Sequence, residues 1–487
     1  MFLNQLFDNA PEIEINQLSI DSRMPMKNCI FFCLSGIKDD GHNFIKEAIS
    51  NGATVVVYEN DIQIEDKAIF IRVSDVAACL NHIAAKFYDY PAKSLDVFVS
   101  SGSEGVSSLT YTIYKLLNNY KKTGSIGSRG IYYNDNHLVN NSPTLTILDN
   151  QKFLRQFVDA GVKAVCLEAD VLALSYKKLD AVNPDVFIYN LTNNRSNEYR
   201  EVGNNYFDIL CSYLYTLDEH TIILLNRDDI SYNELTKASS DNTYSFGLDE
   251  NSDFRITNVQ YSRSGTSFHL SIGDTTYCFN TILLGLNNVY NIVAAVSALY
   301  LKGYSIEELQ AIIPTLKPIR GDMELIDEAA NFNVIVDDAN NMNSIEDVLK
   351  FAKEITLKSK KIYAIWGVNS SDGKNTYDKF VTICEEYLDQ IILTEMNTYS
   401  GSLDTILNTV YNKFTKIKKL IIEDRKVAIE MAIDLLNDGD TLLILGKGNQ
   451  NFIIRNMGKE PYSGDNMIAL NHLKEMKKQY EFDDEMM

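Results

Sequence analysis

One segment of the chain joins a short strand, a glycine turn and a helix, an arrangement that can bind phosphate. An apolar strand is predicted over residues 96–100, a Ser-Gly-Ser-Glu-Gly turn over 101–105 and a helix over 106–117. The first backbone N–H groups of such a helix, together with the positive end of its dipole, attract an anion. The segment is therefore a candidate nucleotide-binding loop.

The side chains in this segment fit that chemistry only in part. Ser107 and Ser108 can offer hydroxyls to a metal ion. A P-loop also carries a lysine for the β- and γ-phosphates, but Val106 occupies the corresponding position, and Glu104 adds a negative charge. Residues 98–112 contain no lysine. An ordinary strand-to-helix turn therefore stays open as the alternative.

Composition and charge narrow the possible partners. The 487 residues carry 45 Lys and Arg against 66 Asp and Glu, a net charge of −21, which disfavours nucleic acid and anionic lipid. The first residues lack the pattern of a secretory leader, and the apolar runs are too short for a membrane span. The seven scattered cysteines lack the spacing of a zinc site. These features predict a reduced cytoplasmic protein that partners neither nucleic acid nor membrane.

The elements around the turn predict an α/β protein in three blocks. Residues 1–92 alternate short strands with helical patterns, and Tyr90-Pro91 is a plausible linker. Residues 93–317 continue the alternation, with antiparallel hairpins expected over 254–280 and a helix over 288–301. Residues 318–487 again alternate apolar strands with helices. Such alternation is typical of parallel sheets covered on both faces, so we expect two doubly wound sheets after a smaller first block.

A series of short motifs runs through all three blocks. They are Asp21-Ser22-Arg23, residues 30–36, Asp40-Gly41-His42, residues 51–53, Asn141-Ser142-Pro143, residues 159–162, residues 168–174, residues 189–192, residues 285–291, residues 321–324 and Gly446-Lys447-Gly448-Asn449-Gln450. Taken in this order, they resemble the Mur ligases, and most closely the UDP-N-acetylmuramyl-tripeptide synthetases. The resemblance covers nearly the whole chain.

The resemblance implies an architecture and a reaction. It implies a UDP-sugar-binding domain over 1–92, a central P-loop-like ATPase domain over 93–317 and an amino-acid-ligase-like domain over 318–487. In this family ATP phosphorylates the glutamyl carboxylate of UDP-MurNAc-L-Ala-D-Glu, and the amine of an amino acid attacks the acyl phosphate. ATP and Mg²⁺ are thus the implied cofactors, and a UDP-MurNAc-peptide or related UDP-sugar is the implied partner.

The site residues follow position by position from the resemblance. Catalytic roles fall to Glu168 and Asp337, and metal binding to Ser107 and Glu168. The nucleotide would be bound by Gly102, Gly105, Ser107, Ser108, Asn288, Asn291 and Arg425. The substrate would be bound by Ser22, Arg23, Asn141, Ser142, Lys178 and Gly446. Lys178 can equally be a solvated helix lysine, and His42 is expected to be a structural part of the first block.

Several positions depart from the family pattern. In the middle block the departures are Val106 for the P-loop lysine, Leu172 and Asn194-Arg195 for histidine-containing motifs, and Leu210 for the carbamylated lysine. In the third block they are Asp322 for an arginine, Asn340 for a histidine, Met396 to Tyr399 for the amino-acid-selecting motif, and Gln450 for a glutamate.

Two hypotheses of different classes therefore remain. The first is an ATP-dependent ligase that acts in peptidoglycan precursor synthesis. The second is a catalytically inactive relative that uses no cofactor and binds a UDP-sugar or a cell-wall synthesis protein as a regulator or scaffold. The missing cations favour the second hypothesis, because each charged clamp on a phosphoryl group contributes a factor of about 10² or more to its transfer. The selecting motif is too altered to name an amino acid.

Overall fold

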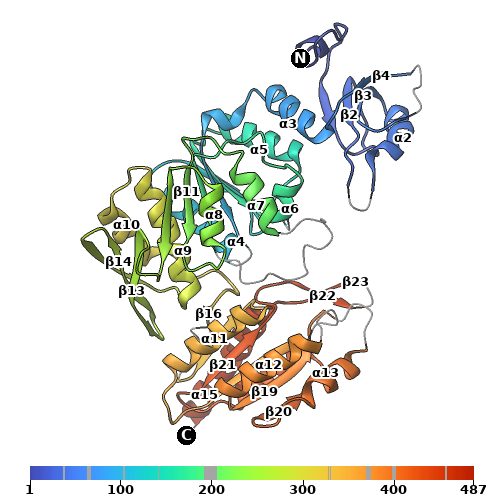
Figure 1. The fold of residues 1–487 in the computed structure, drawn as a ribbon. Coiled ribbons are helices and arrows are strands. Elements are labelled where there is room, and N and C mark those ends of the chain that lie inside the picture. Colours follow the sequence, from blue (N-terminus) through green and yellow to red (C-terminus); the bar gives the residue numbers. More distant parts are fainter. Residues whose placement is uncertain are drawn as a thin grey trace. The chain divides into compact units, whose positions relative to one another are not determined.

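The computed structural model describes residues 1–36, 39–62, 67–102, 105–140, 142–190, 206–326, 328, 331–368, 374–397, 402–455 and 458–486. The chain forms two compact units. One comprises Met1–Ile256, Ser271–Asp274 and Asn291–Leu309, and the other comprises Thr257–Leu270, Thr275–Tyr290 and Gln310–Met487. Both are α/β, which confirms the predicted fold class (Figure 1). The boundaries proposed for the three sequence blocks stay a prediction.

The first ninety residues form a small parallel sheet in the order β1-β2-β3-β4. Its strands are β1 (Gln17–Ser19), β2 (Cys29–Phe32), β3 (Ala53–Tyr58) and β4 (Ile69–Arg72), and its helices are α1 (Leu3–Leu6), η1 (Gly41–Phe44), α2 (Ile45–Ser50) and α3 (Val76–Phe87). Successive side chains of β2 and β3 enter two different apolar clusters. Both strands therefore read as unbroken apolar runs, because both of their faces are covered.

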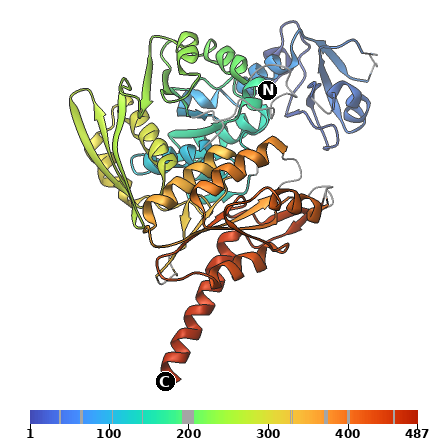
Figure 2. The same ribbon diagram turned by 60° about the horizontal axis from the view of Figure 1, so that its bottom comes forward.

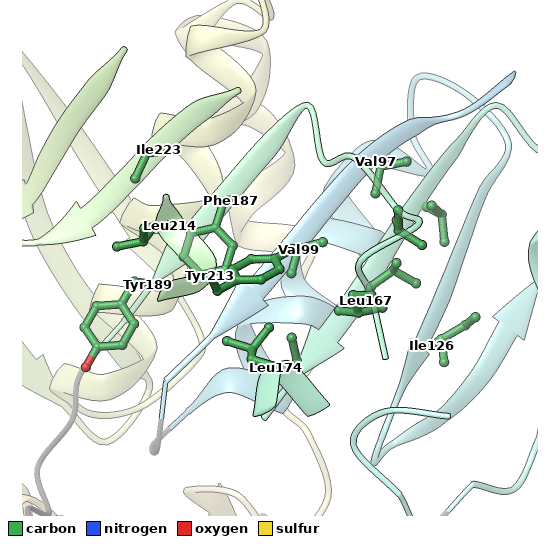
Figure 3. Close-up of a cluster of buried hydrophobic side chains, with 14 of the residues drawn as sticks. Val97, Val99, Ile126, Leu167, Leu174, Phe187, Tyr189, Tyr213, Leu214 and Ile223 are labelled. Carbon is green, nitrogen blue, oxygen red and sulfur yellow. The ribbon is translucent and has the colours of Figure 1, made fainter. Parts of the chain in front are cut away.

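The middle of the chain is built on a larger, mostly parallel sheet. Its strands are β5 (Asp96–Ser101), β6 (Thr123–Gly127), β7 (Gly130–Tyr133), β8 (Asn136–Leu138), β9 (Ala164–Ala169), β10 (Val186–Tyr189), β11 (Ile222–Asn226) and β12 (Thr243–Gly247). Its short and long helices are η2 (Pro91–Ser94), α4 (Val106–Leu117), α5 (Ile147–Asp159), α6 (Val171–Ser175), α7 (Tyr206–Leu214) and α8 (Tyr232–Ala238). Figure 3 shows part of the apolar cluster on this sheet, where the rings of Phe187 and Tyr213 lie 5.5 Å apart.

The strand order places β5 at a turning point of the topology. The parallel strands lie in the order β12-β11-β10-β5-β9-β6. From β5 the chain first builds β6 and β9 on one side, and it then crosses to build β10, β11 and β12 on the other. In open parallel sheets, ligands bind at the carboxyl ends of the strands beside such a reversal. The carboxyl ends of β5, β9 and β10 are therefore where a site is expected.

The predicted hairpins and the helix that follows them are also present. The strands β13 (Phe254–Ser262), β14 (Gly265–Ile272) and β15 (Thr275–Thr281) are consecutive neighbours joined by short turns. After them come α9 (Leu286–Leu301), α10 (Ile306–Ile312) and η4 (Ile313–Thr315).

The C-terminal part contains a second doubly wound sheet in the order β16-β17-β21-β18-β19-β20. Its strands are β16 (Glu324–Leu325), β17 (Asn333–Asp337), β18 (Ile362–Val368), β19 (Gln390–Glu395), β20 (Lys418–Ile421) and β21 (Thr441–Leu445), and only β16 runs antiparallel to its neighbour. The remaining elements are α11 (Met342–Ile355), α12 (Lys374–Tyr387), α13 (Leu403–Tyr411), α14 (Arg425–Asp434), the hairpin β22 (Phe452–Arg455) with β23 (Gly458–Pro461), and α15 (Asp465–Met486). Figure 2 shows α15 extending beyond this sheet. Among the described residues, no helix combines the length and apolarity needed to cross a bilayer.

A buried ion pair joins three elements of the C-terminal sheet. The guanidinium of Arg425, at the start of α14, donates to the carboxylate of Asp465 at 2.8 and 2.6 Å and to the carbonyl of Leu445 at 2.8 Å. Both side chains of the ion pair are 0% exposed, and the hydroxyl of Tyr462 donates to the same carboxylate. The start of α14, the end of β21 and the start of α15 are thus fixed together.

We expect Arg425→Met to lower the free energy of unfolding by about 3–5 kcal/mol, because it leaves Asp465 buried without its counter-ion. Combining it with Asp465→Leu should recover a large part of this loss, because the second change removes the unpaired charge. Urea unfolding of the full chain measures both effects. The exposed neighbour Lys426 provides the control, since Lys426→Met should cost less than about 0.5 kcal/mol. A single variant as stable as the control would contradict the role of the pair.

Lys447 is a second buried cation in this part of the chain. It is 0% exposed, and its ammonium lies 3.3 Å from Asn397 Oδ1 and 3.4 Å from Gln450 Oε1. Burial, and after it the charge of Arg425, lowers the pKa of Lys447 to about 8. The native state therefore binds fewer protons than the unfolded state between about pH 8 and the ordinary lysine pKa of about 10.4.

This shift predicts that stability gains a contribution from Lys447 as the pH rises through that window. The difference in unfolding free energy between the wild type and Lys447→Met should change in favour of the wild type from pH 7.5 to pH 10. The corresponding difference for Lys426→Met should stay constant. Urea titrations at several pH values measure both, and parallel pH profiles for the wild type and Lys447→Met would refute the prediction.

Candidate functional site

The turn after β5 is held by a chain of buried asparagine amides. Gly105 has φ +65°, and a Cβ atom there would lie 3.2 Å from Asn291 Oδ1, which packs behind the turn. Asn190 donates to Asn291, and Asn226 donates to Asn190, each at 3.1 Å. Asn190 directly follows β10, and Asn226 is the last residue of β11. The sequence analysis named Asn291 but missed the other two, whose only signal was an asparagine at the carboxyl end of two successive strands.

The helix after this turn begins with a buried apolar residue where the family has its lysine. Val106 opens α4 and is only 7% exposed, so its side chain contributes to the core. Ser107 is half-buried and Ser108 is buried in the first turn. Gly102 has φ +143°, a conformation that favours glycine. Residues 103 and 104 lie outside the described residues, so the effect expected from Glu104 is not addressed by the structure.

Glu168 lies near the end of β9 with its carboxylate held by a single residue. The backbone N–H of Ser128 donates to Glu168 Oε2 at 2.7 Å, and the Ser128 hydroxyl lies within 3.0 Å of both carboxylate oxygens. The residue is 7% exposed. Burial raises the pKa of Glu168 to about 7, while the hydrogen bonds from Ser128 and the charge of Arg129 act in the opposite direction. A partly protonated carboxyl group is therefore present near neutral pH in the ligand-free protein.

Two neighbouring segments, the end of β6 and residues 142–144, lie close to Glu168. A Cβ atom on Gly127 would come within 2.5 Å of Glu168 Oε2, so the glycine lets the backbone of β6 approach. Thr144 donates to the backbone carbonyl of Glu168 at 2.8 Å, and Ser142 donates to the carbonyl of Thr144 at the same distance. The segment containing Ser142 therefore lies beside the end of β9, whereas the predicted substrate ligand Asn141 lies outside the described residues.

Arg129, which the sequence analysis did not select, completes this group of side chains. It lies in the turn between β6 and β7, and its Nη2 donates to the hydroxyl of Ser108 at 2.7 Å. The structure thus brings together a carboxylate, two serine side chains and a guanidinium beside the first turn of α4. The only signal in the sequence was a single arginine flanked by glycines in Gly127-Ser128-Arg129-Gly130.

The predicted substrate residues of the first block line a separate cavity of about 700 Å³. Ser22 donates to Glu47, and Arg23 forms two hydrogen bonds of 2.8 Å to Asp21. The hydrogen bonds from Arg23 lower the pKa of Asp21 to about 2. The cavity is also lined by the aromatic residues Phe31, Phe44, Phe87 and Tyr88 and by Lys152. Its charged lining residues are the cations Arg23 and Lys152 and the carboxylates Asp21, Asp39, Glu47 and Asp149.

Two further residues from the sequence analysis have clear surroundings. His42 contacts Asp40 through Nδ1 at 2.6 Å and accepts a hydrogen bond from the backbone N–H of Glu59 at 3.1 Å, so it has a structural role in the first block. The carbonyl of Lys178 accepts from Asn150, and its side chain is half-buried. No described contact of its ammonium distinguishes the substrate role from the role of a solvated lysine.

The C-terminal residues gather at the carboxyl ends of β17 and β21. Asp337 is buried and accepts from the backbone N–H groups of Met323 and Ala339 at 2.7 and 2.8 Å. Burial, and after it the charges of Asp338 and Asp322, raises the pKa of Asp337 well above its ordinary value. Gly446 has φ +107° and donates to the carbonyl of Asp337.

Two predicted nucleotide ligands are engaged inside the protein. The guanidinium of Arg425 is fully buried in its pair with Asp465, so this arrangement offers no surface of Arg425 to a nucleotide. Asn288, in the first turn of α9, donates to the carbonyl of Leu284 at 2.8 Å, just before that helix. Their roles in nucleotide binding stay predictions that these contacts do not support.

The described positions that depart from the family pattern differ in burial: Val106, Leu210 and Met396 are buried, whereas Leu172, Asp322, Asn397 and Gln450 are half-buried and Asn340 is exposed. Leu210 is 0% exposed in the apolar cluster of the middle sheet, and Met396 is also buried. Asn397 accepts from Lys447 and from the backbone of Ile454. Asn194 and Arg195, like residues 398 and 399, lie outside the described residues. Leu210 therefore packs in the core at the position where the family has its carbamylated lysine.

Comparisons with known proteins identify the same domains and the same fold in the Mur ligases. Family models described as "Mur ligase family, catalytic domain", "Mur ligase middle domain" and "Mur ligase, glutamate ligase domain" match residues 14–88, 101–299 and 322–448. A solved UDP-N-acetylmuramoyl-L-alanyl-D-glutamate–2,6-diaminopimelate ligase has the same fold, with a TM-score of 0.72 at 19% identity over 98% of this chain and 99% of that one. A MurF ligase from Thermotoga maritima, solved with ADP, gives 0.63 at 17% identity over 94% and 96%.

Curated relatives extend the similarity along the sequence. The chain is 28% identical to UDP-N-acetylmuramyl-tripeptide synthetase 2 of Oceanobacillus iheyensis, over 95% of both chains. It is 30% identical to the UDP-N-acetylmuramoyl-L-alanyl-D-glutamate–2,6-diaminopimelate ligase of Geobacillus kaustophilus, over 91% of both chains. The resemblance found in the sequence motifs is confirmed, and the protein belongs to the Mur ligase family.

Proposed function

We propose that the protein is an ATP-dependent ligase that adds an amino acid to UDP-MurNAc-L-Ala-D-Glu in the cytoplasm during peptidoglycan precursor synthesis. The observation that carries the proposal is the group formed by Glu168, Ser128, Ser108 and Arg129 at the topological reversal of the middle sheet. It retains the metal-binding carboxylate and the hydroxyls despite the loss of the lysine. The curated relatives carry names that state this class of substrate.

The residues present fit a magnesium–nucleotide complex. Mg²⁺ in such sites takes one or two protein ligands and completes its shell with phosphate oxygens and water, so Glu168 and Ser107 would be sufficient. Gly105 has φ +65°, and a Cβ atom there would lie 3.2 Å from Asn291 Oδ1, so a side chain at this position would press on the asparagine behind it. ATP and Mg²⁺ would supply the phosphoryl group and neutralise its charge. The chain itself would position the phosphates with the α4 amino end and hold the glutamyl carboxylate for transfer.

The cavity of the first block would bind the uridine diphosphate end of the substrate. Its aromatic side chains can pack against the base, while Ser22, Arg23 and Lys152 offer donors to the diphosphate. In the C-terminal unit, Asp337 would have a catalytic role and Gly446 would bind substrate, as the resemblance implies. The identity of that amino acid is left open, because Asn397 makes contacts within the protein in place of the family's selecting motif.

A second candidate function is favoured by the packed substitutions. Val106 and Leu210 lie in the core at two positions where the family has lysines, so two cationic or metal-binding groups are absent. A protein with these changes could bind a UDP-sugar or a cell-wall synthesis protein without transferring phosphate. Binding of UDP-MurNAc-dipeptide without binding of Mg-ATP would identify this function.

Turnover with UDP-MurNAc-L-Ala-D-Glu, Mg-ATP and a panel of amino acids tests the proposed ligase. We expect phosphate release and tripeptide formation with at least one amino acid. Glu168→Gln should lower the rate by about 10² to 10³, because it removes the anionic metal ligand while preserving its shape. Glu219→Gln, at an exposed site, is the control with expected wild-type turnover. Calorimetric binding of the dipeptide together with absent ATP binding and turnover would reject the ligase.

The packing of Gly127 against Glu168 gives an independent prediction. Gly127→Ala should lower turnover by about tenfold or more, because the added Cβ displaces the carboxylate from its position. Gly458→Ala is the matched control, since the nearest atom to its Cβ would lie at an ordinary 3.5 Å. Steady-state rates measured at saturating substrate check both variants. Unchanged turnover in Gly127→Ala would show that the observed position of Glu168 is not required.

A further inference from the structure

The guanidinium of Arg129 contacts the first turn of α4 but belongs to a different element from the usual lysine. Arg129 follows β6, whereas the family lysine would sit at the start of α4, where the chain has Val106. Arg129 Nη2 nevertheless lies 2.7 Å from Ser108 Oγ in the first turn of that helix. A positive charge is thus present beside the helix end although the helix does not carry it.

The turn that carries Arg129 is fixed on both sides. Ser128 binds Glu168 through its backbone N–H and hydroxyl, and the hydroxyl of Tyr132 donates to the carbonyl of Arg129 at 2.8 Å. Gly130 has φ +124°, and a Cβ there would lie 2.6 Å from His137 Nε2. The backbone around Arg129 is therefore held by hydrogen bonds to Glu168 of β9 and from Tyr132 of β7, which limits where the guanidinium can lie.

The charges around Arg129 also match a phosphate site. Its guanidinium lies close enough to Glu168 to influence that carboxylate. A cation between a metal-binding carboxylate and a helix amino end is where the negative phosphate oxygens of a nucleotide would approach. Arginine suits this task because its planar group presents five donors and binds phosphate through two parallel hydrogen bonds.

We propose that Arg129 supplies the positive charge that neutralises the nucleotide phosphates, in place of the P-loop lysine replaced by Val106. The inference rests on the proposed function, because it assigns a binding residue to that same site. Hydrogen bonding to Ser108 holds the guanidinium at the first turn of α4 until phosphate oxygens bind. The positive charge at the phosphates is thus supplied by the turn between β6 and β7 and not by α4.

Calorimetric titration with Mg-ATP, Mg-ADP and adenosine tests this assignment on the full chain. Arg129→Ala should weaken ATP and ADP binding by roughly ten- to hundredfold, the range expected for losing a charge-assisted hydrogen bond. Arg129→Gln, which keeps a donor but no charge, should behave similarly, and Arg129→Lys should lie between these variants and the wild type. Adenosine and UDP-MurNAc-dipeptide should bind all of them as they bind the wild type.

A lysine placed at position 106, where the family has its lysine, distinguishes an electrostatic role of Arg129 from a structural one. Val106→Lys in the Arg129→Ala background should recover about tenfold or more of the lost ATP affinity, because a lysine there reaches the same phosphates from the helix. A merely structural role for Arg129 would not be rescued by a lysine at another position. Arg72→Ala, which removes an exposed arginine of the first block, is the control and should bind all ligands normally.

The outcomes distinguish this inference from the proposed function. Equal ATP affinity in the wild type, Arg129→Ala and Arg129→Gln, with intact turnover in the wild type, would overturn the role of Arg129 and leave the ligase standing. Loss of ATP binding in Arg129→Ala without recovery by Val106→Lys or Arg129→Lys would also overturn it, since Arg129 would then be structural. Absence of ATP binding in the wild type would reject both the ligase and the role of Arg129.

Discussion

The middle of the molecule is organised around the buried carboxylate of Glu168. A carboxylate taken out of water is costly unless hydrogen bonds replace its hydration. Ser128 supplies these bonds from its backbone and hydroxyl, and the lack of a side chain at Gly127 allows the approach. The shifted pKa of Glu168 shows that this replacement is incomplete. A bound cation would complete it, and this is the role that the proposed function gives to Glu168.

The C-terminal unit also buries charged groups, but it stabilises one of them with an ion pair. Arg425 and Asp465 are both fully buried, but they neutralise each other and fasten two helix starts to the end of β21. Asp337, a few residues away along the neighbouring strand, has only backbone donors and a strongly raised pKa. A paired charge of the first kind maintains the fold, whereas a carboxyl group of the second kind remains available for a ligand. The predicted roles of Arg425 in nucleotide binding and of Asp337 in catalysis both stay predictions, and only the contacts of Arg425 speak against its role.

The sequence predicted the elements better than the contacts. The apolar runs over residues 96–100, 164–168 and 441–445 are strands in the structure, because strands covered on both faces must be apolar throughout. The order of the motifs likewise identified the family. The pair between Arg425 and Asp465 and the approach of Arg129 to Ser108 join residues 40 and 21 positions apart. No local pattern specifies such contacts, so they could only be found in the folded chain.

The substitutions at the candidate site are not uniform in kind, and this bears on the choice between the two proposed functions. Leu210 is 0% exposed within the apolar cluster of the middle sheet, so restoring a lysine there without other changes places a charge among apolar neighbours. Glu168, Ser108 and the asparagines behind Gly105 instead keep polar contacts that packing alone does not require. The hydrogen bonds among Glu168, Ser128, Ser108 and Arg129 at the reversal of the parallel sheet are the contacts on which the proposed ligase site rests. The retained polar group and the lost lysines are therefore most simply reconciled by a site whose positive charge comes from another part of the chain.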